Sequence, residues 1–245
     1  MGQNPDLSTA AQPASERQAR ALRILDAAVE LILRWGYDKT TIADIARQAG
    51  VGKGTIYLHW RTRADLFRAL IMREQLAVAL DSKQRISADP QGATLGGIAR
   101  HTALAAMQRP LIKALFLRDV DVLGKLADSE LSSAVYAARL SGFKVYLELL
   151  RQHGLARTDL SLEAETHIWS AIFAGFFLGT TWMPEEFALS DEELAELLGE
   201  TVHRALETGE PIPAETLQAI TRAFVAYMDQ TTSLAVERFQ QELGA

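Results

Sequence analysis

The 245-residue chain contains no cysteine, no long apolar run and no stretch of alternating β-branched residues. The lack of cysteine excludes disulfide scaffolds, thiolate metal sites and cysteine nucleophiles, and is consistent with a cytoplasmic location. No apolar run reaches the roughly 18–20 residues that cross a bilayer, so we expect no membrane partner. The polar N-terminus also lacks the apolar core of a signal peptide.

Catalytic and metal-binding patterns are missing as well. No nucleophile elbow supports a Ser-His-Asp arrangement, and His153, His167 and His203 lack the spacing of metal ligands. Glu163 and His167 are four residues apart, but on a helix such a pair is more simply an ion pair at the surface. We therefore expect no enzyme, no catalytic residue, no metal and no cofactor.

Helical spacing of apolar residues runs through nearly the whole chain, and 48% hydrophobic residues suffice for a real core. This pattern predicts an all-α fold. Capping-box spacing marks helix starts at Thr41 with Asp44 and at Thr62 with Asp65, and Gly36 is a natural stop. The helices are expected at 17–35, from 41 to the turn at Gly50, and at 53–60, 63–85, 92–108, 111–118, 129–153, 161–182, 190–208 and 214–241.

Three regions follow from this reading: a disordered arm at 1–16, a three-helix unit at 17–62 and a larger helical domain at 63–245. The charge is divided in a similar way. Residues 1–75 hold 11 Lys/Arg and 8 Asp/Glu, a net charge of +3, whereas residues 76–245 hold 14 and 23, a net charge of −9. A basic region on an acidic protein indicates a local anionic partner, although charge clusters are often only solvated surface.

The stretch "AGVGKGTIYLHW", Ala49–Trp60, joins two predicted helices. A phosphate-binding P-loop needs Ser or Thr after its Gly-Lys and a strand before it, whereas here Gly54 follows and a helix precedes. A helix-turn-helix explains the stretch better, because the tight turn needs a residue such as Gly50 that tolerates positive φ. Ile56 and Trp60 are then expected to pack inward.

The remaining side chains of this unit suit DNA. We expect Gly54 to allow close backbone approach and Thr55 to offer a hydroxyl and a methyl to base edges. Phosphate oxygens are expected to be contacted by the side chains of Thr41, Lys53, Tyr57, His59 and Arg63. Taken alone, Tyr57 is better explained as a half-buried core residue and His59 as an ordinary surface histidine, but together and in this order the residues favour DNA binding.

The segment "GYDKTTIADIARQAGVGKGTIYLHWRTRADLF", Gly36–Phe67, closely resembles the TetR family of transcriptional regulators. The resemblance implies a dimeric all-helical regulator, usually a repressor that leaves a pseudo-palindromic operator when a small molecule binds its C-terminal domain. It also implies DNA contacts at the seven positions named above. Gly52 stands where serine is common, Trp60 where phenylalanine is usual and Arg63 where lysine is usual. The alternative is a helical ligand-binding protein or enzyme without operator binding.

The family layout places an effector pocket among the middle helices of the second half. Apolar walls with a few polar groups suit a largely apolar effector. The candidate lining residues, each of which also reads as ordinary core, are His101, Met107, Phe116, Tyr136, Phe143, Tyr146, Trp169 and Phe173.

Three features of the second half leave alternatives open. Helices 161–182 and 190–208 resemble the family's dimer pair, with Gly175 and Gly179 allowing close approach, or the first is a fully buried core helix. Helix 214–241 is an extra C-terminal helix that covers the core or enlarges the dimer. Arg118, Asp119 and Asp121 form a solvated turn, which we favour, or an internal network that couples the domains.

Overall fold

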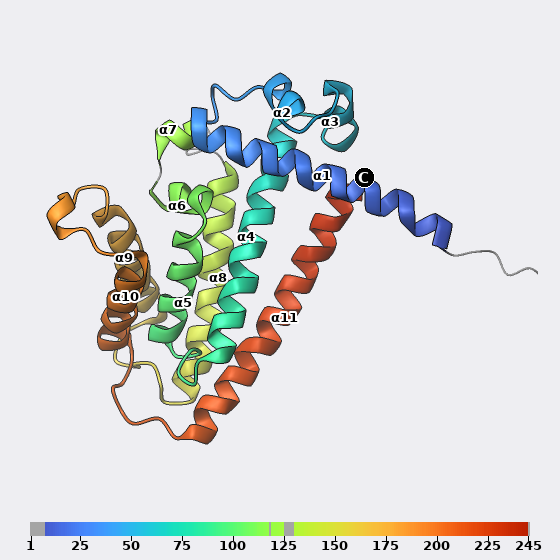
Figure 1. Ribbon diagram of the computed structural model, residues 1–245. Coiled ribbons are helices and arrows are strands. Elements are labelled where there is room, and N and C mark those ends of the chain that lie inside the picture. The colour runs from blue at the N-terminus through green and yellow to red at the C-terminus, as the bar shows by residue number, and fades with distance from the viewer. Residues whose placement is uncertain (1–7, 118, 125–129, 245) are drawn as a thin grey trace, which may run out of the picture.

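The computed structural model describes residues 8–117, 119–124 and 130–244, and this part of the chain is helical and without strands (Figure 1). The all-α prediction is therefore confirmed. The helices are α1 (Ser8–Trp35), α2 (Ile42–Gln48), α3 (Lys53–His59), α4 (Arg63–Ala88), α5 (Leu95–Met107), α6 (Pro110–Leu117), α7 (Val120–Leu123), α8 (Glu130–Gln152), α9 (Leu162–Gly179), α10 (Asp191–Leu206) and α11 (Ala214–Gly244), with a 3₁₀ turn at Glu185–Phe187.

Helices α1 to α3 form a small unit at one end of the molecule. Gly36 ends the turn after α1 with φ 80°, and Gly50 makes the turn between α2 and α3 with φ 65°. Only glycine adopts such angles without strain, which explains both positions. The inward faces are buried, including Ile45 and Ile56, which are fully shielded from solvent.

Helix α4 leads from this unit into the second domain, and α11 returns along it (Figure 1). Lys83 of α4 and Asp229 of α11 form an ion pair between the two helices. At its C-terminal end, α11 inserts Phe239 and Leu243, 7% and 1% exposed, into the same core cluster as Ile45 and Ile56. The extra helix therefore covers the core of its own chain, and its last turns belong to the N-terminal unit rather than to the second domain.

In the second domain α5 and α6 pack against α4, α10 packs on α5, and α9 packs on α6, α8 and α10. The tightest crossing of the domain joins α5 and α10 at two glycines. A Cβ at Gly96 would lie 2.8 Å from the Gly199 carbonyl oxygen, and a Cβ at Gly199 would lie 2.9 Å from the Gly96 oxygen. Both positions therefore need glycine for the backbones to approach. A Cβ at Gly175 or Gly179 would meet no described atom of the same chain within 4 Å, and the close approach expected there to a partner helix stays a prediction.

Three sequence-based expectations need correction. Helix α1 begins at Ser8, so the expected arm at 1–16 is wrong from that residue onward, and 1–7 lie outside the described residues. The favoured turn after α6 is the short helix α7, whose amides of Asp121 and Val122 bond to the Asp119 carboxylate, while Arg118 lies outside the described residues. The alternative that α9 is a fully buried core helix of one chain also fails, because Gly175 is exposed, while the favoured dimer interface stays a prediction.

Candidate nucleic-acid interface

The helix-turn-helix is held at both starts by its predicted caps. Thr41 accepts a hydrogen bond from the Asp44 amide at 3.2 Å, and the Asp44 carboxylate accepts one from the Thr41 amide at 3.3 Å. This capping box fixes where α2 begins. Gly52 is the N-cap of α3 and makes no side-chain cap bond, as expected for glycine in place of serine.

Helix α3 divides into a buried and an exposed face. Ile56 and the following Trp60 are 0% and 4% exposed and pack into the core of the unit. Lys53, Gly54 and Tyr57 are exposed, Tyr57 to 51%. The prediction that Ile56 and Trp60 point inward while Lys53, Gly54 and Tyr57 point outward is therefore confirmed.

Thr41 and Thr55 are less free than their neighbours. Thr55 is half-buried on α3. The Thr41 hydroxyl lies 2.6 Å from the Asp44 carboxylate and also caps α2. Hydrogen bonds from Thr41, more than any other contact, hold the pKa of Asp44 below its usual value. A DNA contact by the Thr41 hydroxyl would therefore compete with an existing hydrogen bond.

His59 was expected to face outward, and this is wrong. Its side chain is 8% exposed and lies beside Trp60, with ring centroids 5.3 Å apart. Burial, followed by the positive charge of Arg17, lowers the pKa of His59 from its usual value. A buried, neutral imidazole cannot take part in the exposed face of α3. Spacing alone did not reveal this, because the element that covers His59 comes from the far end of the chain.

Arg63 was likewise expected to contact phosphate, but its guanidinium is occupied within the chain. It lies 4.0 Å from the centroid of the Tyr37 ring and donates to the Tyr37 carbonyl. It also lies 5.2 Å from the ring of Phe67, which packs edge-on against Tyr37. The stacking and the hydrogen bond hold the start of α4 against the loop between α1 and α2. Arg63 positions the unit rather than extending its surface.

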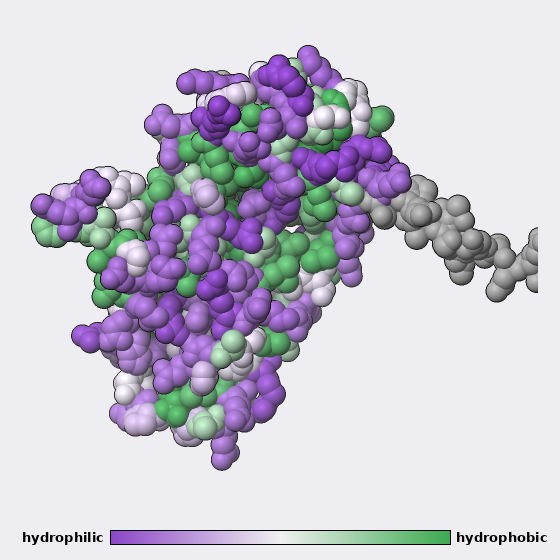
Figure 2. Space-filling model, viewed as in Figure 1, coloured by the Kyte–Doolittle hydropathy of each residue, from purple (hydrophilic) through white to green (hydrophobic). Residues whose placement is uncertain are grey.

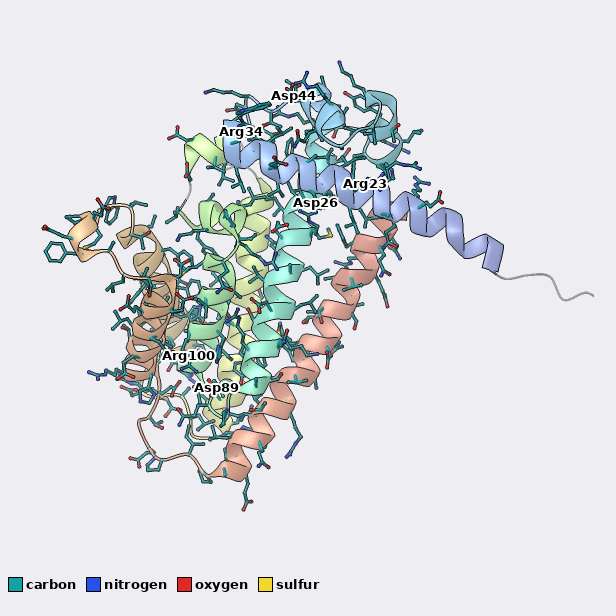
Figure 3. All side chains as sticks on the ribbon, viewed as in Figure 1. Arg23, Asp26, Arg34, Asp44, Asp89 and Arg100 are labelled. Atoms are coloured by element: carbon teal, nitrogen blue, oxygen red, sulfur yellow. The ribbon has the colours of Figure 1, made fainter. Side chains whose placement is uncertain are left out.

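Cationic side chains around α1 to α3 are mostly unpaired. Among the described residues, Arg47 forms an ion pair with Asp44 at 2.5 Å, whereas four neighbouring cations form none. These four are Arg20, Arg23, Lys53 and Arg61. Figure 2 shows hydrophilic side chains gathered over α1, and Arg23 is labelled on that helix in Figure 3. Unpaired cations on one end of an acidic protein create a local positive potential.

The aromatic side chains predicted to line a pocket form one stacked row in the second domain. Phe143 stacks on Trp169 with centroids 4.4 Å apart, and Trp169 stacks on Phe173 at 5.8 Å. Phe116 joins the row at 5.5 Å from Phe173. Phe177, which sequence analysis did not single out, completes the row beside Phe116 at 4.5 Å.

The other four pocket candidates lie elsewhere or are occupied. His101 lies 2.8 Å from the Asp89 carboxylate, which also pairs with Arg100 at the far end of α4 (Figure 3). The Tyr146 hydroxyl donates to the Ala93 carbonyl, and burial raises the pKa of this tyrosine. Met107 is buried core, and the side chain of Tyr136 lies outside the described residues.

Glu163 pairs with Lys144 at 3.0 Å rather than with His167. Within the described ranges, no group of three His, Cys, Asp or Glu side chains could hold a metal ion. None of the described helices is long and apolar enough to cross a bilayer.

Sequence reasoning missed two further features of the N-terminal unit. Phe239 and Leu243 complete its core, and Arg17 bonds to the α3 backbone, with its guanidinium 3.2 Å from the Leu58 carbonyl oxygen. The apolar stripe of helix 214–241 was visible, but nothing in the sequence showed which surface it covers. Arg17 fell within the arm-to-helix boundary, where no pattern predicted a contact.

Comparison with known proteins gives a consistent assignment. Residues 24–70 match the sequence profile described as bacterial regulatory proteins of the tetR family. The chain is 32% identical over 96 residues to the fatty acid metabolism regulator protein of Bacillus subtilis, a match that covers 37% of this chain and only 48% of that protein. It is 20% identical over 170 residues to the transcriptional regulator SrpR of Pseudomonas putida, covering 69% and 77% of the two chains.

Solved structures share the fold. NalD of Pseudomonas aeruginosa, described as the secondary repressor of the MexAB-OprM multidrug efflux pump, superposes with a TM-score of 0.58 at 22% identity, covering 80% of this chain and all of that one. SmeT, the repressor of the Stenotrophomonas maltophilia multidrug efflux pump SmeDEF, gives 0.55 at 18% identity, covering 79% and 97%. Residues 24–70, which include the capped helix-turn-helix, therefore match the tetR family of bacterial regulatory proteins, and the chain as a whole is similar in fold to the solved structures of such regulators.

Proposed function

We propose that the protein is a DNA-binding transcriptional regulator that places α3 in the major groove. The observation that carries this proposal is the exposed face of α3, where Lys53, Gly54 and Tyr57 stand over a fully packed core. A seven-residue helix is about 10 Å long and fits a groove roughly 12 Å wide. Lys53 and Tyr57 contact phosphates, Gly54 admits close approach, and Thr55 reaches base edges.

The regulator works as a homodimer through α9 and α10. Small and apolar residues face outward there and in the connecting loop, as at an interface rather than an ordinary surface. They are Ala171, Ala174 and Gly175 on α9, Leu197 on α10, and Trp182 and Phe187 between them. A two-fold dimer of this kind reads half-sites of a pseudo-palindrome about 34–36 Å apart.

The effector is a small, largely apolar molecule that binds at the aromatic row of the second domain. Phe116, Phe143, Trp169 and Phe173 provide flat apolar surfaces, which suit an aromatic or hydrophobic compound. NalD and SmeT are described as repressors of multidrug efflux pumps, and the neighbour RolR was solved with resorcinol. By analogy, this regulator is a cytoplasmic repressor that the effector releases from its operator.

Two helices carry the effector signal to the DNA-binding unit. Helix α4 belongs to both domains, and α11 runs beside it and ends in the core behind α3. An effector that favours a different position of either helix changes the spacing of the two α3 helices. The coupling between such sites is typically about 1–3 kcal/mol, a 5- to 150-fold change in affinity.

Selection of fragments from genomic DNA with the purified full chain tests the proposal. We expect enrichment of a pseudo-palindrome, and loss of that enrichment with Lys53→Ala. If no palindrome is enriched while aromatic compounds still raise the melting temperature, the alternative holds, namely a ligand-binding protein or enzyme on this fold. A thermal-shift screen of aromatic and lipid-like compounds then identifies the effector.

A further inference from the structure

A pocket of about 360 Å³ lies between the N-terminal half of α1 and the recognition helix α3. It adjoins the exposed face of α3 through Thr55 but extends away from it along α1. Its walls carry Glu16, Arg17, Arg20, Thr55, Leu58 and His59. The lining residues named here carry two guanidinium groups and one carboxylate, and Arg17 has a further interaction within the chain.

Arg17 is held in place by a hydrogen bond, whereas Arg20 is only partly shielded from solvent. Arg17 and Arg20 are both half-buried, and Arg17 donates to the Leu58 carbonyl at 3.2 Å. Arg20 forms no ion pair with any described side chain. A planar guanidinium that is already positioned loses little freedom on binding, and it matches the geometry of a phosphate.

His59 supplies a third polar group at the wall of this pocket. The side chain is more than nine-tenths buried, and its Nδ1 has no hydrogen-bond partner among the described atoms. Nδ1 is shielded from solvent and the Leu243 backbone lies against the imidazole, so His59 senses the charge in the pocket rather than binding its anion. An anion also offsets the positive charge of Arg17 and Arg20, which disfavours protonation of His59.

The position of the pocket indicates which anion it meets. In Figure 1 the N-terminal half of α1 extends past α3 on the side away from α9 and α10, the helices of the proposed dimer. A duplex lying on both α3 helices would pass this end of α1 just outside each half-site. We propose that the pocket binds a DNA backbone phosphate on the outer flank of the half-site read by α3. This inference rests on the proposed DNA-binding function and assigns an additional part of its interface.

The decisive variant is Arg20→Gln, because Arg20 forms no hydrogen bond or ion pair with a described residue and glutamine keeps part of its aliphatic stem. Arg17→Gln with Arg20→Gln is the stronger double variant. The control is Arg222→Gln, an exposed arginine on α11 that removes the same charge away from α3. Affinity is measured by fluorescence anisotropy over a range of salt concentrations, on a duplex ending at the half-sites and on one extended outward by several base pairs.

We expect the double variant to bind the extended duplex about tenfold more weakly and to lower the salt slope by about one for each phosphate lost. Both duplexes should then bind alike, whereas the wild-type protein and Arg222→Gln should prefer the extended one. The imidazole of His59, followed by NMR, should also shift when the extended duplex is added.

Two results would overturn the inference. If the wild-type protein binds its operator but Arg20→Gln and the double variant keep both the preference for the extended duplex and the salt slope, the pocket takes no DNA phosphate and the proposed function stands. If inorganic phosphate at constant ionic strength shifts His59 fully while the variants change DNA binding no more than Arg222→Gln, the anion is a free one. Failure of the proposed function would give a different result from failure of this inference, because the wild-type protein would then bind no duplex specifically.

Discussion

Cations are used differently in the two parts of the molecule. Between residues 20 and 61, Arg20, Arg23, Lys53 and Arg61 form no ion pair within the described chain. From α4 to α10, most described guanidinium groups bind carboxylates, some on the same helix and others on a neighbouring one, as Arg151 of α8 binds Glu165 of α9 at 2.6 Å. The second domain uses many of its charges to hold its own helices together, whereas these cations of the N-terminal unit stay unpaired within the described chain, as the proposed DNA binding requires.

The largest effect should come from breaking the buried pair of the second domain. Glu165 is fully buried, and burial raises its pKa even though Arg151 acts in the opposite direction. Arg151→Ala leaves this carboxylate without its cation, which should lower the free energy of unfolding by about 3 kcal/mol or more. Chemical denaturation measures this loss.

The matched control is Arg204→Ala, which removes the exposed pair with Glu200. Its cost should stay below about 0.5 kcal/mol. Equal losses for the two variants would contradict the distinction between a buried and an exposed pair.

The next prediction tests where the end of α11 belongs. Phe239 and Phe224 lie on the same helix and are 7% and 6% exposed, but Phe239 packs in the N-terminal core and Phe224 in the second domain. Either one replaced by alanine should lower the free energy of unfolding by about 3 kcal/mol. Only Phe239→Ala should also increase hydrogen exchange in α3. If hydrogen exchange in α3 is the same for both variants, the end of α11 does not belong to the N-terminal unit.

A smaller effect is expected at the exposed face of α3. Tyr57→Ala removes a half-exposed ring and leaves the core untouched, so the melting temperature should not change. Operator affinity should fall roughly tenfold, or about 1.4 kcal/mol. Leu58→Ala is a useful comparison, because Leu58 is even more exposed, at 73%, and offers no hydrogen bond. A larger loss with Leu58→Ala than with Tyr57→Ala would mean that Tyr57 has no polar contact with DNA.

The smallest effect concerns pH. Burial lowers the pKa of His59 in the folded protein, so below pH 6.5 the unfolded chain binds a proton that the folded chain excludes. The stability from His59 is complete above pH 6.5 and is lost as the pH falls toward its lowered pKa. Denaturation of the wild-type protein and His59→Gln between pH 7 and 5 should show a shallower decline for the variant. Parallel curves would mean that His59 is not buried in solution.

The sequence predicted the N-terminal unit well because its determinants are local. Thr41 with Asp44 fixes a helix start within three residues, and Gly50 fixes the turn through its own φ angle. Errors arose where distant segments meet. The burial of His59 depends on α1 and the end of α11, and the close approach of Gly96 and Gly199 joins positions about a hundred residues apart.

The functional residues were likewise predictable where local spacing decides their position, and not where distant segments meet. The outward position of Lys53 and Tyr57 follows from the buried spacing of Ile56 and Trp60 on one short helix. In the second domain the sequence shows only apolar and aromatic residues at helical spacing. This pattern cannot tell a side chain that binds within the chain, such as His101 with Asp89, from one that joins the stacked row, such as Trp169. Such contacts between side chains of different helices become known only when the positions of the helices are known.

The most direct test of the account is the salt dependence of operator binding by the full chain. If the unpaired cations of the N-terminal unit form the interface, the logarithm of the association constant should fall linearly with the logarithm of salt concentration, with a slope of about −0.9 for each phosphate neutralised. Lys53→Ala should reduce that slope by about one. An affinity that does not respond to salt, or a slope that Lys53→Ala leaves unchanged, would contradict the claim.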